Sequence, residues 1–192
     1  MEREEGRRER MLRQAIEGYQ RALARLPRER LPVDHARTLG SLANAYQERA
    51  LIRDKEANLL KAIGLYGEVA GLLPQDRFPL DFAMTQNNLG NAYGLLAGVR
   101  DKEANLGRAI AAFQAALRTY TEAAFPVQFA VTQNNLGTAY GALAEVRDKE
   151  ANLTLAIAAF QAALRTYTEA AFPDLHQRVA ANLEMARRAK EG

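Results

Sequence analysis

A stretch of 47 residues occurs twice in succession, and this duplication limits the possible fold more than any other feature of the chain. Residues 78–124 and 125–171 differ at only 8 of their 47 positions. Residues 31–77 form a more diverged copy in the same register, and half copies flank the three at residues 1–30 and 172–192. Units repeated at this period stack side by side to bury a continuous core, so we expect a repeat array of these five segments.

Each full copy carries two apolar patterns typical of amphipathic α-helices. In the copy at 78–124, apolar residues recur at spacings of three and four, first over about 80–97 and then over about 102–123. A Phe-Pro pair opens residues 78–124, 125–171 and 172–192, where proline ends one helix and begins the next. The pattern predicts an all-α fold, an α-solenoid of about eight antiparallel helices. We expect these helices near residues 12–26, 33–50, 55–72, 80–97, 102–123, 127–144, 149–170 and 174–189.

The two helices of each full copy are joined by the run Arg-Asp-Lys-Glu-Ala-Asn-Leu, which begins at Arg53, Arg100 and Arg147. Aspartate is a favourable N-cap residue, and a glutamate in the first turn suits the helix dipole. Repeated carboxylates can also form a cation site. Because the run recurs at the same turn of every full copy, helix capping by the aspartate and local ion pairs are the favoured interpretation.

Small and aromatic positions of the second copy resemble the tetratricopeptide repeat (TPR). The resemblance lies in Leu89-Gly90, Ala92-Tyr93, Ala109-Ile110, Phe113 and Ala116-Leu117. It implies a right-handed superhelix in which the first helix of each copy lines a concave surface. Because a TPR has about 34 residues, these copies are extended, as in kinesin light chain and in bacterial arrays joined to CHAT peptidases.

The TPR family closes its second helix with a proline. Here that proline is present at Pro27 and Pro74, whereas Thr121 and Thr168 replace it in the later copies. The replacement predicts that these second helices continue toward Ala124 and Ala171.

The composition and motifs point away from catalysis. The chain has no cysteine, two histidines and one serine, and it contains no phosphate-binding loop, zinc-protease motif or nucleophile elbow. Its net charge of +3 is small for a nucleic-acid binder, and no apolar run has the ~20 residues needed to span a bilayer. We therefore expect no enzymatic activity, no cofactor, no metal, no nucleic-acid or membrane partner, and a cytoplasmic location.

Histidines and glycines have structural interpretations. His35 stands where Phe82 stands in the next copy, so we expect a partly buried ring, whereas we expect His176 to be exposed. Gly90 and Gly94, like their counterparts 47 residues later, have the small-xxx-small spacing that favours close helix packing.

Asparagine is a mediocre helix former, yet the pairs at 87–88 and 134–135 fall in the middle of first helices. An amide can donate and accept at once, so a row of asparagines can hold an extended peptide main chain. Alternatively, Asn88, Asn135 and Asn182 bridge adjacent repeats through hydrogen bonds to helix backbone. Mapping the concave positions of the TPR family predicts that the peptide-binding residues are Arg37, Asn44, Gln47, Met84, Asn87, Asn91, Val131, Asn134, Thr138 and Arg178.

The resemblance implies a non-enzymatic scaffold that binds a protein, as a peptide or helix, in its concave groove. Two alternatives stay open: a module that stacks head to tail through its half repeats, and a regulatory fragment of a larger signalling or peptidase protein. Arg187 replaces a core tyrosine, and Arg188 and Lys190 follow it. Because these charges and those of residues 2–8 resemble polar end caps, we expect a monomer or weak oligomer.

Overall fold

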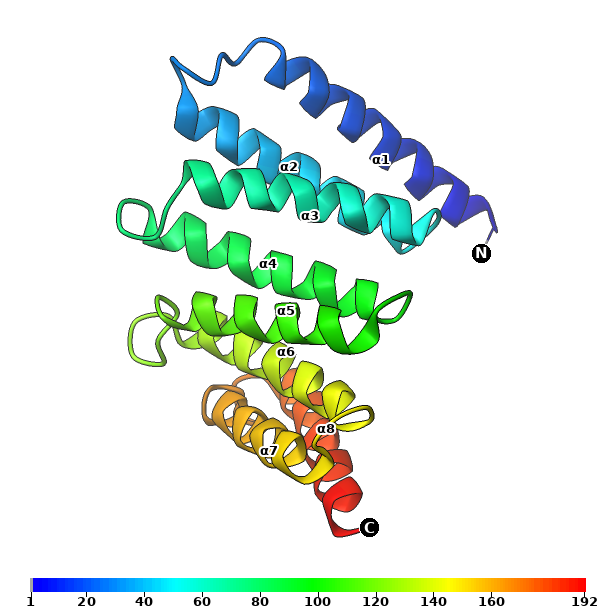
Figure 1. The fold of residues 1–192 in the computed structure, drawn as a ribbon, viewed down its shortest axis with the longest axis vertical. Helices are drawn as coiled ribbons and strands as arrows, with labels where there is room; N and C mark the ends of the chain where they lie inside the picture. The colour runs from blue at the N-terminus through cyan, green and yellow to red at the C-terminus, as the bar shows by residue number, and fades with distance from the viewer. Residues whose placement is uncertain (1) are drawn as a thin grey trace.

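The computed structural model describes residues 2–192, with side chains from residue 4 onward, so the predicted charges of Glu2 and Arg3 lie outside the described side chains. Over this range the chain forms eight α-helices and no strand, which confirms the all-α solenoid (Figure 1). The helices are α1 (Glu2–Leu23), α2 (Pro32–Ala50), α3 (Lys55–Leu72), α4 (Pro79–Ala97), α5 (Lys102–Leu117), α6 (Pro126–Ala144), α7 (Lys149–Thr166) and α8 (Pro173–Glu191).

The helices form two layers, one of even-numbered and one of odd-numbered members. Each helix packs against its neighbours in the chain, and successive even-numbered helices also touch one another. Within residues 2–192, successive odd-numbered helices do not touch. A stack curves toward its more closely spaced layer, so α2, α4, α6 and α8 line the concave side. The axes also turn along the stack, and α8 descends more steeply than α4 in Figure 1.

The core is built from the same positions in each copy. Phe113, at 2% exposure, and Phe160 lie between their own helix pair and the next repeat. A Cβ atom placed on Gly90 would come within 2.6 Å of the Phe113 ring, and one on Gly137 within 2.7 Å of Phe160. The predicted close packing is therefore confirmed for these two glycines. It is wrong for Gly94 and Gly141, around which a Cβ atom would meet nothing within 4 Å.

Helices α5 and α7 end earlier than predicted, at Leu117 and Thr166 instead of near residues 123 and 170. The helical hydrogen bonding of α5 ends before Thr121, whose Oγ1 accepts a hydrogen bond from the backbone N–H of Ala124 at 3.3 Å in the turn that follows. The same bond joins Thr168 and Ala171. A threonine turn therefore stands where the earlier repeats have Pro27 and Pro74.

An aromatic pair anchors each of these turns. The buried ring of Tyr120 packs edge-on against Phe125, and Tyr167 packs in the same way against Phe172, with ring centroids 6.0 and 5.4 Å apart. Helix α1 also departs from its predicted bounds of 12–26. Its charged N-terminal residues, which are good helix formers, extend it back to Glu2, and it ends at Leu23.

The aspartate of each interhelix turn occupies the N-cap position, but its side chain makes no capping hydrogen bond, so that part of the prediction is wrong. Asp101 has a left-handed backbone with φ of 45°, and its carboxylate accepts from Arg100 Nε at 3.0 Å. The buried Asn105 closes the turn by donating from Nδ2 to the Arg100 carbonyl at 2.8 Å. The same geometry recurs in the other two full copies.

The left-handed backbone at Asp101 leads to a comparison of two substitutions. A left-handed conformation costs an alanine about 1–2 kcal/mol but costs glycine almost nothing. Both Asp101→Ala and Asp101→Gly remove the ion pair with Arg100. We expect the glycine variant to be more stable than the alanine variant by about 1 kcal/mol in urea denaturation. Equal midpoints for the two variants would contradict the left-handed assignment.

The two histidines occupy the same position of the repeat, in copies that lie three 47-residue periods apart. Each ring is half-buried, and Nδ1 of His35 and of His176 lies 2.7 Å from a carbonyl oxygen, that of Leu26 and of Tyr167 respectively. The expectation for His35 is confirmed. The expected exposure of His176 is wrong because the residue occupies the same position of the repeat as Phe82 and Phe129.

Candidate functional site

The candidate site is the concave groove, defined here as the surface of α2, α4, α6 and α8 that faces away from the odd-numbered helices. Two hollows lie between successive helices of this layer. The N-terminal pocket, about 250 Å³, lies between α2 and α4 and includes Arg37, Asn44 and Met84. The C-terminal pocket, about 360 Å³, lies between α6 and α8 and includes Thr138. Predicted site residues therefore line both pockets.

Arg37 is tied to the next repeat. Its Nε and Nη2 atoms donate to the two carboxylate oxygens of Asp81 at 2.9 and 3.2 Å, which joins α2 to α4 across the N-terminal pocket. This hydrogen bonding, with the charge of Asp81, raises the pKa of Arg37. The guanidinium is also exposed, so it keeps donors that face solvent. Asp81 was missed from the sequence because only the packed helices show that it faces Arg37.

A buried tyrosine orients the amides of α2. The Tyr66 hydroxyl lies 2.5 Å from Asn44 Oδ1, to which it donates, and 3.2 Å from Gln47 Oε1. Burial, with a smaller contribution from the Glu48 charge, raises the pKa of Tyr66, so the hydroxyl stays protonated and acts as a donor. Asn88 Nδ2 also donates to Asn44 Oδ1, at 3.2 Å. The later copies have phenylalanine in place of Tyr66 and lack this hydroxyl.

The asparagine row also joins the later repeats. Asn87 Oδ1 lies 3.2 Å from Thr132 Oγ1, which also donates to the Gln128 carbonyl at 2.8 Å, and Asn134 Oδ1 accepts from Asn182 Nδ2 at 3.4 Å. Asn88 and Asn182 therefore bridge adjacent repeats, but they bond to side-chain amides and not to the helix backbone as predicted. Within the described side chains, the Nδ2 groups of Asn87 and Asn134 donate no hydrogen bond, so these donors stay free for a ligand.

The predicted site residues all lie on even-numbered helices, and none is fully buried. Asn87, Asn91, Asn134 and Gln47 are half-buried, and the others are exposed. Met84 and Val131, which occupy the same repeat position, have 51% and 37% of their surfaces exposed. The groove thus brings together amide donors, exposed apolar side chains, and arginines at its two ends.

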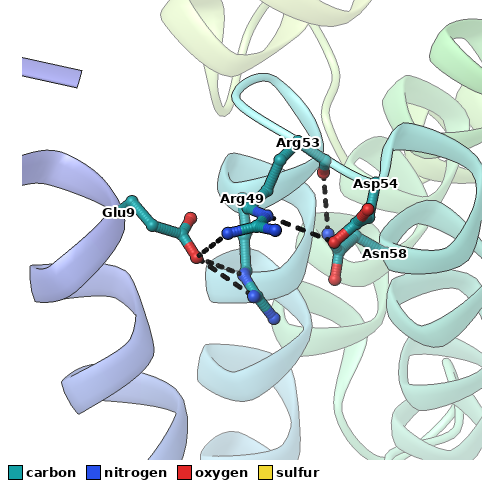
Figure 2. Close-up of polar contacts among 5 residues, drawn as sticks. All are labelled: Glu9, Arg49, Arg53, Asp54 and Asn58. Carbon is teal, nitrogen blue, oxygen red and sulfur yellow. Dashed lines mark hydrogen bonds and ion pairs between the residues drawn. The ribbon is translucent and has the colours of Figure 1, made fainter. Parts of the chain in front are cut away.

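An ion-pair ladder joins the interhelix turns of successive repeats. Arg100 Nη1 lies 2.9 Å from Glu56, and Arg147 Nη1 lies 3.2 Å from Glu103. The first rung joins Arg53 to Glu9, which also accepts from Arg49 at 3.0 Å (Figure 2). This confirms the expected local ion pairs and extends them between repeats. In residues 2–192 no group of three or more histidine or acidic residues is arranged to hold a metal ion.

The chain matches no known protein-family model, and a comparison with curated proteins found no match. Among the described helices, none combines the length and apolar character needed to cross a membrane.

Proposed function

We propose that the protein is a non-enzymatic scaffold that binds an extended peptide segment of a partner protein along the concave groove. One observation carries the proposal: exposed apolar side chains gather on the central helices of the concave layer. Leu80 and Met84 of α4 and Val127 and Val131 of α6 are all exposed to solvent. Because a contiguous exposed apolar surface is a common mark of a protein-binding site, the middle of the groove suits a partner's apolar side chains.

The asparagine donors add a means of holding the peptide main chain. Asn87 and Asn134 occupy the same repeat position in α4 and α6, and these two helices contact each other. Axes of packed helices lie about 8–10 Å apart, and an extended peptide in the polyproline II conformation advances about 3.1 Å per residue with three residues per turn. The two Nδ2 groups would therefore meet peptide carbonyls about three residues apart. Main-chain carbonyls are present in every peptide, so these contacts supply affinity without selecting a sequence.

A triple substitution of Asn87, Asn91 and Asn134 by alanine tests the proposal. The probe is a set of peptides selected from a random phage-displayed library against the whole chain. Each lost neutral hydrogen bond is worth about 0.5–1.5 kcal/mol, so we expect the peptide affinity to fall at least about tenfold. Because these contacts are uncharged, the affinity should depend weakly on salt. Isothermal titration calorimetry measures both quantities.

Gln161→Ala provides the matched control, since this amide side chain is exposed on α7, outside the concave layer. The control should bind as the wild type does, and far-ultraviolet circular dichroism should show the same helicity in all three proteins. Failure of the library to yield any binder, or undiminished binding by the triple variant, would contradict groove recognition by the asparagines.

A further inference from the structure

The C-terminal pocket differs in chemistry from the rest of the groove. Apolar and small residues of three helices line it, among them Gly141 and Ala142 of α6, Phe160 of α7, and Met185 and Ala189 of α8. Its volume of about 360 Å³ is within the range of ligand-binding pockets, which is about 300–1,000 Å³. This open hollow is therefore large enough to hold a large side chain.

The two nearly identical copies differ in residues that line this pocket. Three of their eight differences line it: Thr138 replaces Asn91, Ala142 replaces Leu95, and Glu145 replaces Gly98. In the second copy the isobutyl group of Leu95 packs against the hydrophobic core. Only a methyl group, that of Ala142, stands at this position in the third copy, and it lines the hollow between α6 and α8. The lining of this pocket is therefore specific to the third repeat.

The charges at the pocket do not cancel. Glu145 lines the pocket, but Lys102 of the preceding repeat lies 2.6 Å from its carboxylate. Lys149 also lines the pocket, and within the described side chains it forms no ion pair. One positive charge at this edge of the pocket thus has no partner of opposite sign.

We propose that the C-terminal pocket is the specificity subsite of the groove and takes one large apolar side chain of the bound peptide, with an acidic residue beside it that pairs with Lys149. This inference rests on the proposed function, since it concerns the same peptide. The uniform asparagine contacts hold any main chain, whereas the pocket and Lys149 select among sequences. Enclosing a large apolar side chain contributes about tenfold to hundredfold in affinity, and the exposed ion pair contributes about twofold to fivefold.

The test compares the peptides that wild type, Ala142→Leu and Lys149→Glu each select from the random displayed library. We expect wild type to enrich a large apolar residue next to an acidic one. Ala142→Leu places in the third repeat the residue that the second repeat already accommodates at Leu95, so the fold should be retained. This variant should lose the apolar enrichment and bind wild-type-selected peptides at least about tenfold more weakly. Lys149→Glu should keep the apolar preference and replace acidic neighbours with basic ones.

The outcomes separate the two levels of the proposal. If wild type selects no peptide, the proposed function and the subsite both fall. If wild type and Ala142→Leu select the same peptides with the same affinity, groove binding stands and the subsite is wrong. If the acidic preference survives Lys149→Glu, the role of Lys149 is wrong.

Discussion

Replacing Phe113 by alanine is expected to lower the free energy of unfolding by about 3–5 kcal/mol. The ring is 2% exposed and lies directly against Gly90. Because glycine has no side chain, it cannot fill the cavity that the substitution leaves. Phe160 has the same environment one repeat later, and Phe160→Ala should cost a similar amount. Urea denaturation followed by circular dichroism measures both losses.

Phe129→Ala is the matched control for this prediction, because this ring is only half-buried. It should cost less than either core substitution. A loss below about 1 kcal/mol for Phe113→Ala would show that the ring does not pack where the repeat pattern and the structure place it.

The sequence predicted the helices well because a 47-residue period fixes their register several times over. Five of the eight predicted C-terminal bounds lie within two residues of the observed ends. The predictions failed at α1, α5 and α7, where local chemistry decides. The absence of proline at Thr121 predicts that α5 continues. Instead, the Thr121 hydroxyl accepts from a backbone N–H in the turn that follows the helix, and the buried Tyr120 ring anchors this turn.

The turn aspartates show a different limit of the sequence. The N-cap rule predicts their position correctly, but it assumes an extended backbone in which the side chain reaches back to the helix. At Asp101 the backbone is left-handed, and the carboxylate turns to Arg100. The available signal was Asn105, a buried amide repeated at the same place in each copy, whose hydrogen bond closes the turn.

The groove positions could be predicted from the repeat, but their contacts could not, because contacts depend on how far neighbouring repeats are shifted along each other. Arg37 and Asp81 are 44 residues apart, as are Asn44 and Asn88. The Glu56–Arg100 pair of the ladder has the same separation. Each of these separations is three residues shorter than the 47-residue period. Each residue therefore contacts a residue of the next repeat that lies about one helical turn before its own equivalent there. Only the packed structure reveals this offset, and with it the partners of the site residues.

Substituting alanine at Gly90 and at Gly94 should change stability in opposite directions, although the two glycines are one helical turn apart in α4. Alanine is a better helix former by about 0.8–1.0 kcal/mol, and around Gly94 its methyl group would meet nothing within 4 Å. Gly94→Ala should therefore stabilise the protein by up to about 1 kcal/mol. At Gly90 the new Cβ would lie 2.6 Å from the Phe113 ring, so Gly90→Ala should destabilise by about 1–3 kcal/mol.

In the first copy, alanine (Ala43) stands at the position of Gly90 and tyrosine (Tyr66) at the position of Phe113. The packing at this position therefore depends on both residues and not on the glycine alone. Adding Phe113→Leu to Gly90→Ala should therefore recover part of the loss, because a smaller, flexible side chain can yield to the methyl group. The double-mutant cycle measures this coupling, which for residues in contact is about 0.5–3 kcal/mol. Strict additivity of the two substitutions, or equal effects at Gly90 and Gly94, would mean that the close approach of α4 to the Phe113 ring does not hold the helix pair together.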